Sequence, residues 1–396
     1  MDNFESLLAR ATTPASGNPA SADLLGAVSL VVDDQGEALY CHVAGRQSLA
    51  VDAPPLDADC TVSLGSAGKF ITHIAALQLV EKGLLSLSEP VYAHVPELER
   101  CQVVTENGNG LRPPKSPITL RHLLLHASGL SDHDTVDRLY GQGTAERLTA
   151  QLLGDDADIL AQRISLPLIF DPGEGHAYGY SIHWTQLLVT RAAGAGTFMK
   201  YLQENIFDPL GMASTSYTPR LVEDVWQRRL HMVERKDNTL VSAENAFQGL
   251  TCSVSDVGRV LSAVLRESPK LLTERAHWDL LWQGQFATGS PSFENVRAET
   301  DNYGFVTGRA NGHTLSSPPA VNWSAGGLVV EGDEALPVSG MPPGTVTWEG
   351  MPNVLWAINR EKKRALFFAT QLVPVGDPKA NELALNFMHD AWKKFT

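Results

Sequence analysis

Strand-like runs occur at both ends of this chain, whereas helical patterns fill its middle. Residues 27–32 and 38–43 are rich in β-branched and apolar side chains. The turn-forming stretch Asp33-Asp34-Gln35-Gly36 lies between them, so these segments predict a β-hairpin. Four further short strands are expected at residues 326–330, 345–348, 354–358 and 365–370. The sequence therefore predicts an antiparallel sheet to which both ends of the chain contribute.

The other segments predict helices around this sheet. A short helix is expected over residues 2–10, and residues 381–395 have the spacing of an amphipathic helix. From residue 70 to about residue 265 helical patterns dominate, and they are interrupted by clusters of Gly and Pro near Pro113-Pro114 and Asp171-Pro172-Gly173. The expected class is α+β, with an antiparallel sheet flanked by helices and a helical lobe inserted within it.

The order of these segments divides the expected fold into two lobes. Residues 1–85 together with residues 250–396 are expected to form a discontinuous sheet lobe, and residues 86–249 a helical lobe. A chain of 396 residues with 43% apolar content is long enough to bury the core of such an assembly. The active site is expected in the crevice between the lobes, since pockets commonly form at such junctions.

One short motif points to chemistry. Ser66 and Lys69 are separated by Ala67-Gly68 and precede the largely apolar helical stretch of residues 70–85. Residues three apart on a helix are neighbours, and a lysine in a partly desolvated site can lose its proton and activate a serine hydroxyl. S-x-x-K is a signature of serine β-lactamases and penicillin-binding proteins. Taken alone, the motif is equally compatible with a helix N-cap serine followed by a solvated lysine.

Several further segments occur in the order found in one family. They are Gly26-Ala27-Val28, residues 118–124, the stretch His126-Ala127-Ser128-Gly129-Leu130, Pro172-Gly173 with Tyr178, residues 201–211 and residues 344–353. With Ser66 and Lys69, the chain resembles the class C β-lactamase-type serine hydrolases, and in particular their esterase and acyltransferase branch, which includes the fungal lovastatin-type acyltransferases. The resemblance covers almost the whole chain and implies a fold like that of serine β-lactamases and penicillin-binding proteins.

Two positions depart from the β-lactamase pattern. The Tyr-x-Asn triplet of the family corresponds to Tyr178-Gly179-Tyr180, so the asparagine that helps hold a β-lactam amide is absent. The Lys-Thr-Gly triplet corresponds to Trp348-Glu349-Gly350, which removes the usual partner of the substrate carboxylate. Both changes argue against a working β-lactamase and favour an esterase or acyltransferase with a larger and less anionic substrate.

The resemblance also implies a mechanism. Ser66 is expected to attack a carbonyl, while Lys69 and Tyr178 share the removal of its proton. Which of the two is the base is left open, because interacting groups titrate as a pair. The backbone N–H groups of Ser66 and Met351 are expected to hold the oxyanion. The other residues expected at the substrate are Gly350, which allows close backbone approach, and Trp348, Tyr180 and His176, which line the pocket.

The expected reaction is acyl transfer through an acyl-enzyme on Ser66, in secondary metabolism. The donor is expected to be a small-molecule ester or thioester, or an acyl-carrier protein domain, and the acceptor an alcohol or water. No cofactor is expected. The alternative is a member of the fold without hydrolytic activity, with a role in binding, lactonisation or cyclisation. The retained Ser66, Lys69 and Tyr178 favour the first reading, whereas Tyr180 and Trp348 keep the second open.

Composition excludes several other functions. The formal net charge of −14 disfavours binding to nucleic acids or anionic membranes. No stretch approaches 18 uncharged apolar residues, and the N-terminus has no apolar segment typical of a secretory signal. These features predict a cytoplasmic enzyme with reduced cysteines and no membrane partner. The cysteines, none of which has metal-like spacing, are Cys41, Cys60, Cys101 and Cys252.

A metal site is weighed and set aside. His122 and His126 are four residues apart on an expected helix, and His133-Asp134 follows them. The chain has no H-E-x-x-H motif there, and a third ligand is not evident. Both histidines fall in a segment that matches the family, where a structural role is expected, so no metal is predicted.

Overall fold

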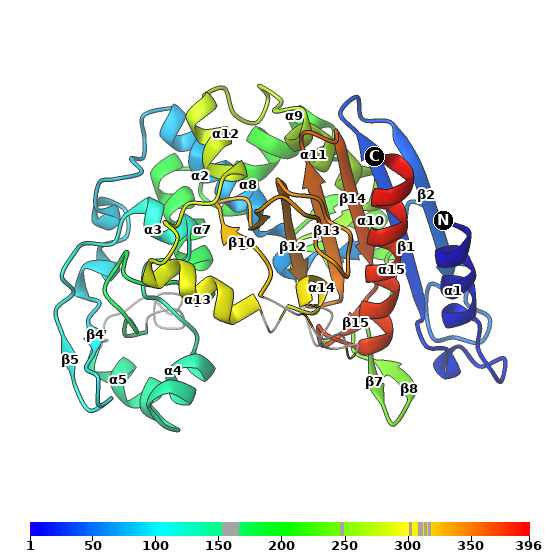
Figure 1. The fold of residues 1–396 in the computed structure, drawn as a ribbon, viewed down its shortest axis with the longest axis horizontal. Coiled ribbons are helices and arrows are strands. Elements are labelled where there is room, and N and C mark those ends of the chain that lie inside the picture. Colours follow the sequence, from blue (N-terminus) through cyan, green and yellow to red (C-terminus); the bar gives the residue numbers. More distant parts are fainter. Residues whose placement is uncertain (153–165, 246–248, 301–302, 308–311, 313–314, 316–317) are drawn as a thin grey trace.

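The structure, a computed structural model, describes residues 1–152, 166–245, 249–300, 303–307, 312, 315 and 318–396. Its centre is a seven-stranded sheet in which all neighbouring strands are antiparallel, in the order β10-β11-β12-β13-β14-β1-β2 (Figure 1). The strands are β1 (Gly26–Asp33), β2 (Ala38–Gly45), β10 (Val321–Trp323), β11 (Leu328–Val330), β12 (Thr345–Gly350), β13 (Val354–Asn359) and β14 (Arg364–Ala369). The predicted antiparallel sheet and the α+β class are confirmed.

Strand β1 joins the two ends of the chain. Its Val28 lies opposite Val43 of β2 on one side and opposite Ala369 of β14 on the other. All residues of β1 except Asp33 are buried, as expected for a strand covered on both faces. Each strand expected from the sequence overlaps a strand of the sheet, and the predicted hairpin is β1–β2. Strand β10 was not predicted.

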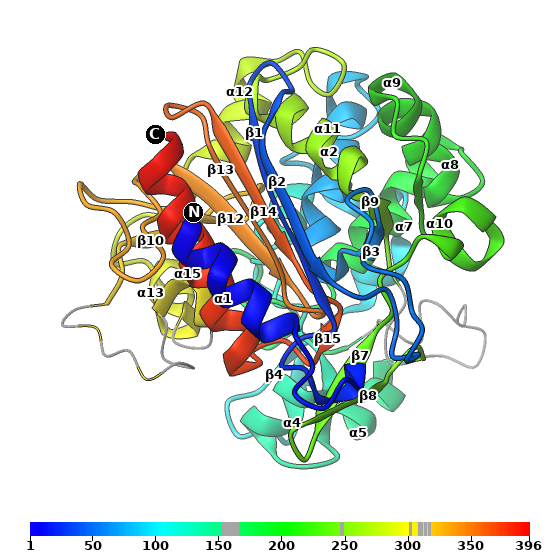
Figure 2. The ribbon, with the colours of Figure 1, turned by 90° about the vertical axis from the view of Figure 1, so that its right-hand side faces the viewer.

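Helices cover both faces of the central sheet. Figures 1 and 2 show α1 (Asp2–Thr12) and α15 (Pro378–Phe395) together on one face. Helix α11 (Val254–Leu265) packs on the other face, with α2 (Lys69–Glu81) beside it. The start of α15 follows a common rule, since the Asp377 side chain accepts the N–H groups of Lys379 and Ala380 and Pro378 occupies the first turn.

The region between these elements is less helical than the sequence pattern suggested. Its helices are α3 (Leu120–Leu124), α4 (His133–Tyr140), α5 (Thr144–Leu152), α7 (Ser181–Ala193), α8 (Phe198–Leu202), α9 (Asp208–Leu210) and α10 (Glu223–Gln227). Its short strands are β4 (Val103–Val104), β5 (Leu111–Arg112), β6 (Thr215–Ser216), β7 (Val233–Lys236), β8 (Thr239–Ser242) and β9 (Thr251–Ser253). These strands pair with one another or with distant segments, so their local pattern carries little strand signal.

The remaining elements complete the C-terminal half and the second small sheet. They are β3 (Thr61–Ser63), α12 (Arg275–Trp282), α13 (Pro291–Glu299), α14 (Gly304–Thr307) and β15 (Leu372–Val373). Strand β9 lies between β3 and β6 in a three-stranded sheet, and a second such sheet has the order β15-β7-β8. Strand β3 leads directly to Ser66, so this small sheet fixes the approach of the chain to the predicted nucleophile.

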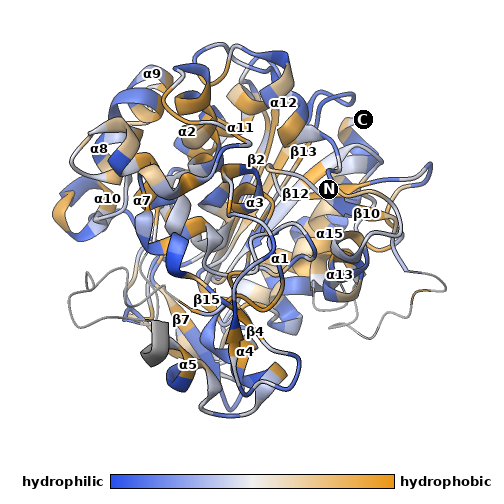
Figure 3. Cartoon of the chain, turned by 90° about the vertical axis from the view of Figure 1, so that its left-hand side faces the viewer, coloured by the Kyte–Doolittle hydropathy of each residue, from blue (hydrophilic) through white to orange (hydrophobic). Residues whose placement is uncertain are grey.

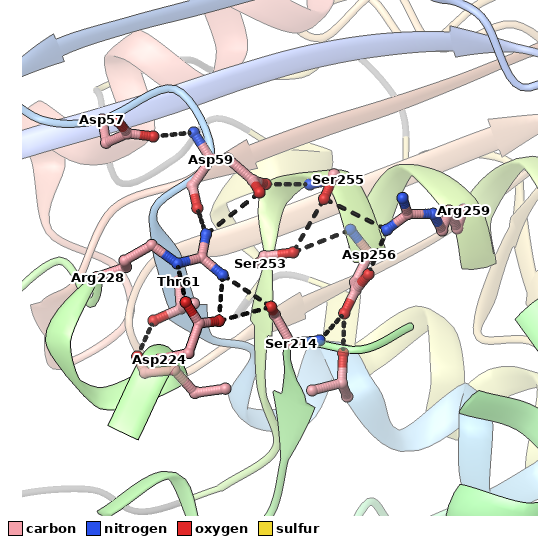
Figure 4. A network of polar contacts seen from close by, with 12 residues as sticks. Asp57, Asp59, Thr61, Ser214, Asp224, Arg228, Ser253, Ser255, Asp256 and Arg259 are labelled. Carbon is pink, nitrogen blue, oxygen red and sulfur yellow. Dashed lines mark hydrogen bonds and ion pairs between the residues drawn. The ribbon is translucent and has the colours of Figure 1, made fainter. Parts of the chain in front are cut away.

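A polar network braces the edge of the β3–β9–β6 sheet (Figure 4). Arg228 donates hydrogen bonds to both carboxylate oxygens of Asp224, at 3.0 and 2.7 Å, and to the hydroxyl of Ser214 at 2.7 Å. It also donates to the backbone carbonyl of Asp59, whose carboxylate in turn accepts the N–H of Ser255 at the start of α11. The network therefore connects α10, the end of the small sheet and the start of α11 through hydrogen bonds.

A continuous core of buried apolar side chains runs from α1 and α15 through the central sheet to α2 and α7. Figure 3 shows this apolar character along the strands of the central sheet and along α2. The division into lobes at residues 85/86 and 249/250 stays a prediction. Residues 153–165 and 246–248 of the expected helical lobe lie outside the described residues.

Candidate active site

Ser66 lies in a tight turn immediately before a buried helix. The turn is a 3₁₀ segment over Gly65–Gly68, and α2 begins at Lys69 rather than at Ser66. The two side chains remain neighbours, because residues three apart eclipse one another in a 3₁₀ turn. Gly65 has a φ of 56°, a left-handed conformation that glycine adopts without strain. Residues 70–79 of α2 are all buried, so the helix holds Lys69 in a fixed position.

The structure brings the three predicted catalytic side chains together. The Nζ atom of Lys69 lies 2.9 Å from Oγ of Ser66 and 2.5 Å from the hydroxyl oxygen of Tyr178. The ammonium also lies 4.2 Å from the centroid of the Tyr178 ring. All three residues are partly exposed, so a substrate can reach them. A lysine between a serine and a tyrosine can carry a proton between the two oxygens, which is the chemistry that serine activation requires.

The loop that carries Tyr178 is anchored at its start. The carboxylate of Asp171, 4% exposed, accepts two hydrogen bonds of 2.8 Å from the guanidinium of Arg112. These bonds hold the pKa of Asp171 well below its usual range, against the opposing effect of burial. Lys115 adds a third bond through its backbone N–H. The start of the loop is therefore fixed by charge-assisted hydrogen bonds, which the planar guanidinium of an arginine donates to a carboxylate in pairs.

His126 contacts the backbone on both sides of Tyr178 and also the Tyr178 ring. Its backbone carbonyl accepts the N–H of Ala177 at 3.0 Å, and its Nδ1 atom accepts the N–H of Gly179 at 3.5 Å. Its ring lies 4.7 Å from the ring of Tyr178, at an interplanar angle of 32°. The side chain is 1% exposed. Three contacts from one residue therefore set the backbone and the ring of the predicted catalytic tyrosine.

The sequence did not single out this residue. His126 was expected on a helix with His122, but α3 ends at Leu124 and His126 has a φ of 52°. The helical expectation was wrong because the chain turns into a left-handed conformation there, which is uncommon for residues other than glycine. The only signal was the position of His126 in a segment that matches the family. His122 instead accepts the N–H of Thr119 in the capping box of α3.

Trp348 reaches the same tyrosine from the central sheet. Its Nε1–H donates a hydrogen bond of 3.1 Å to the hydroxyl oxygen of Tyr178. The indole is 5% exposed and packs edge-on against Trp323, with ring centroids 4.6 Å apart. Tyr303 covers it at 5.1 Å. Trp348, at the position where β-lactamases have a lysine, thus supplies a neutral donor to the predicted catalytic tyrosine. Its contact with substrate stays a prediction.

The end of β12 lies against the turn that carries Ser66. A Cβ atom at Gly350 would lie 2.0 Å from the carbonyl oxygen of Leu64, so only glycine fits there. A Cβ atom at Gly65 would lie 2.9 Å from the backbone nitrogen of Met351. The backbones of these two segments are therefore in contact, as two N–H groups facing one oxyanion require. The oxyanion role of Ser66 and Met351 stays a prediction.

Burial keeps two histidines near the site, His73 and His126, neutral. Burial lowers the pKa of His73 to about 4, although its Nδ1 atom lies 2.6 Å from the carbonyl of Ala325. Burial and the neighbouring His176 hold the pKa of His126 well below its usual range. Both imidazoles therefore stay neutral near pH 7.

His176 and Tyr180 lie at the margins of the site. The ring of His176 is 3% exposed and lies 4.9 Å from that of Trp323, and its Nδ1 atom lies 3.1 Å from a carboxylate oxygen of Glu299. Tyr180 packs toward α4, where its ring centroid lies 6.2 Å from that of His133. The structure thus places His176 against Trp323 and Tyr180 beside α4. Their contact with substrate stays a prediction.

The described part of the chain lacks two other features, a metal-binding cluster and a membrane-spanning helix. No group of three or more His, Cys, Asp or Glu side chains there is arranged to hold a metal ion. Among the same residues, no helix combines the length and the apolar character needed to cross a bilayer.

The chain is similar to several known proteins in sequence and in fold. The family model described as Beta-lactamase matches residues 12–387. The acyltransferase calJ of Penicillium decumbens is 31% identical over 91% of this chain and 87% of its own length. The lovastatin esterase of Penicillium rubens is 30% identical over 94% of this chain and 95% of its own. The unliganded simvastatin synthase LovD of Aspergillus terreus superposes with a TM-score of 0.82 at 27% identity, covering 99% of this chain and 98% of that one.

Proposed function

This chain belongs to the Beta-lactamase family, and we propose that it is a serine acyltransferase or esterase that forms an acyl-enzyme on Ser66. Family membership and the structural match confirm the resemblance and the fold expected from the sequence. The relatives confirm the expected class of enzyme, since they are named as acyltransferases and an esterase. Catalytic roles for individual residues are part of the proposal.

A single observation carries the proposed mechanism, namely that Lys69 Nζ lies between Ser66 Oγ and the Tyr178 hydroxyl. Ser66 Oγ attacks the carbonyl carbon of an ester or thioester and gives its proton to the Lys69–Tyr178 pair. The oxyanion is held by the N–H groups of Ser66 and Met351. When the carbon–oxygen or carbon–sulfur bond breaks, the same pair returns the proton to the leaving group.

The second half of the reaction reverses these steps with a new nucleophile. An alcohol or a water molecule gives its proton to the Lys69–Tyr178 pair and attacks the acyl group on Ser66, and the released Ser66 oxygen takes a proton back. The acceptor is an alcohol in a transferase and water in an esterase. We include in the proposal a donor carried on an acyl-carrier protein domain. The coarser statement, a small-molecule acyl donor and acceptor, agrees with the names of the relatives.

The location of the enzyme and its lobes complete the proposal. A cytoplasmic location is supported by the four cysteines, which are unpaired thiols. A role in secondary metabolism is supported by relatives named as a lovastatin esterase and a monacolin J acid methylbutanoyltransferase. Two lobes, of residues 1–85 with 250–396 and of residues 86–249, are supported by the site itself. Ser66 and Trp348 come from the first of these segments and Tyr178 from the second.

Intact-protein mass spectrometry tests the acyl-enzyme directly. The protein is incubated with p-nitrophenyl esters of increasing acyl length, and a mass increase equal to one acyl group is expected. Ser66→Ala should abolish both the adduct and p-nitrophenol release while the protein stays folded. Turnover near the wild-type rate in Ser66→Ala, with an adduct on another residue, would remove Ser66 from the mechanism.

A further inference from the structure

Glu349 lies on the part of β12 that faces the predicted catalytic side chains, and its neighbours in sequence both contact them or their supports. Trp348 donates its hydrogen bond to Tyr178, and the backbone of Gly350 lies against the turn of Ser66. Side chains alternate between the two faces of a strand, so Glu349 and Trp348 point to opposite faces of β12. A movement of Glu349 would therefore reach the site through the strand itself.

The side chain of Glu349 borders a small recess on this second face. The recess has a volume of about 280 Å³ and lies between the end of β12, the start of β13, α14 and α15. Its other lining residues carry no charge, and they are Phe305 of α14, residues 353–355, and Ala380, Asn381 and Ala384 of α15. The carboxyl group therefore faces an uncharged and mainly apolar wall, which disfavours its ionised form.

Two polar groups at the recess have no partner among the described residues. The Glu349 carboxyl forms no hydrogen bond or ion pair with any of them. Asn381 is only 7% exposed, and its Nδ2 group has no acceptor. The other amide at the recess, Asn353, is engaged, since its Nδ2 donates to the carbonyls of Leu372 and Pro374 at 2.7 and 2.9 Å. Asn381 is thus the free donor on the α15 wall.

Glu349 carries its proton at neutral pH. Burial raises the pKa of its carboxyl to about 8. The side chain is half-buried rather than sealed, so the proton can leave to solvent. The carboxyl therefore changes its charge within a pH range that the folded protein can be studied in.

The charged and titratable groups near the recess do not compensate an ionised Glu349. Tyr303, which precedes α14, stays neutral because burial and Glu299 raise its pKa well above the usual value. Its hydroxyl donates to Glu299 of α13 at 3.3 Å, so this element presents a second carboxyl group rather than a cation. On α15, Lys379 is paired with Asp23.

We propose that Glu349 is a positioning residue of the Ser66 site, and that it holds the end of β12 in place only while its carboxyl is uncharged. When the carboxyl releases its proton to solvent, the carboxylate attracts water and the Asn381 amide into the recess. The end of the strand then shifts, so the Trp348 hydrogen bond and the N–H of Met351 lose their alignment. This inference rests on the proposed acyl-transfer function and adds control of the same site by pH.

Stopped-flow acylation by p-nitrophenyl octanoate at pH 7 and pH 9 tests this control. A group with a pKa of about 8 is uncharged in about ten of eleven molecules at pH 7 and in about one of eleven at pH 9. The ratio of the rate at pH 9 to that at pH 7 should therefore be about tenfold larger in Glu349→Gln, which stays uncharged, than in the wild type. Ionisation of Lys69 and Tyr178 contributes equally to both ratios.

Glu361→Gln is the matched control, because it removes an exposed carboxyl from the β13–β14 turn of the same sheet. Its ratio should equal that of the wild type. A ratio in Glu349→Gln within twofold of the wild type, or an equal change in Glu361→Gln, would overturn the inference.

Asn381→Leu tests the recess itself and serves if Glu349→Gln does not fold. It removes the donor that stabilises the ionised carboxylate, so the pH midpoint of the fall in acylation should rise by about one unit or more. An unchanged midpoint would overturn the role given to the recess.

Urea unfolding separates this inference from the proposed function. A carboxyl whose pKa is raised on folding stabilises the protein fully below its pKa in the unfolded chain, near 4.5, and this stabilisation is lost as the pH rises to 8. Between pH 5 and 8 the unfolding equilibrium constant of the wild type should therefore rise relative to that of Glu349→Gln, by up to about tenfold per unit.

The two measurements fail in different ways. A pH-dependent difference in unfolding with an unchanged rate ratio would overturn the positioning role, and no difference in unfolding would overturn the uncharged carboxyl. Absence of acylation by any ester would refute the proposed function, whereas unfolding would still report the ionisation of Glu349.

Discussion

The hydrogen bond from Trp348 to Tyr178 should contribute measurably to the acylation of Ser66. Trp348→Phe keeps an aromatic ring against Trp323 and Tyr303 but removes the only donor of the indole, which lies 3.1 Å from the Tyr178 oxygen. A hydrogen bond to a neutral group contributes about 0.5–1.5 kcal/mol, whereas one to a charged group contributes about 1.5–3 kcal/mol. The size of the effect therefore reports the charge that Tyr178 carries during the reaction.

If Tyr178 gives up its own proton in the transition state and so becomes negatively charged, the rate constant of acylation should fall about 10- to 150-fold. If its oxygen stays neutral, the fall should be about 2- to 10-fold. The assay is the pre-steady-state release of p-nitrophenol in a stopped-flow instrument, which isolates acylation from later steps. In a Tyr178→Phe background, Trp348→Phe should have almost no further effect, because the acceptor is already gone.

Trp323 provides the matched control. It is a buried indole 4.6 Å from Trp348, and its Nε1–H has no hydrogen-bond partner among the described residues. Trp323→Phe removes an indole donor that makes no hydrogen bond to Tyr178, and it keeps an aromatic ring beside Tyr178, where the two ring centroids lie 6.2 Å apart. If Trp323→Phe and Trp348→Phe slow acylation equally, the effect arises from packing and the reasoning fails. A change of less than twofold in Trp348→Phe would also refute a role for this hydrogen bond.

Three further outcomes are expected. Lys69→Ala and Tyr178→Phe should each lower kcat/KM about 10²- to 10⁴-fold, and the double variant should be scarcely slower, whereas additive losses would show that the two residues act independently. His126→Ala should lower kcat more than it raises KM. His126→Asn should retain most activity, because asparagine tolerates the left-handed backbone and keeps an acceptor. Equal losses of activity in the two variants would refute the positioning role of His126. Burial lowers the pKa of His73 to about 4 in the folded protein, whereas it is near 6.5 in the unfolded chain, so protonation below pH 6.5 favours unfolding. Acidification from pH 7 to 4.5 should therefore lower the free energy of unfolding by about 2–3 kcal/mol through this residue. Urea unfolding of His73→Gln should show a correspondingly smaller decrease.

The sequence predicted most of the central sheet because its strands have strong local patterns. Residues 354–358 and 365–370 are apolar runs bounded by turn residues, and they appear as β13 and β14. The β7–β8 hairpin and the β3–β9–β6 sheet were not predicted. Their strands are two to four residues long. In the β3–β9–β6 sheet the paired strands also lie far apart in sequence, as for Thr61 opposite Ser253, whereas β7 and β8 are neighbours in the chain. A pattern confined to a few residues cannot report a pairing that depends on the tertiary fold.

The proximity of the three predicted catalytic side chains was predictable for a related reason. Ser66 and Lys69 are three residues apart in one turn, so local geometry makes them neighbours. Tyr178 was identified through the resemblance to the family. The residues that position Tyr178 could not be found in this way. His126 acts through its backbone conformation and Trp348 through one N–H, and neither property follows from residue type or spacing. The sequence predicts that Trp348 lines the pocket, but only the structure shows that its indole N–H donates a hydrogen bond to Tyr178, the predicted catalytic tyrosine.

The exchange of a lysine for Trp348 changes the site in two connected ways. A lysine at this position would bring a second amine close to Lys69, in surroundings where burial keeps His73 and His126 neutral. Trp348 instead donates a hydrogen bond from a neutral indole to Tyr178, so this position contacts the predicted catalytic tyrosine directly.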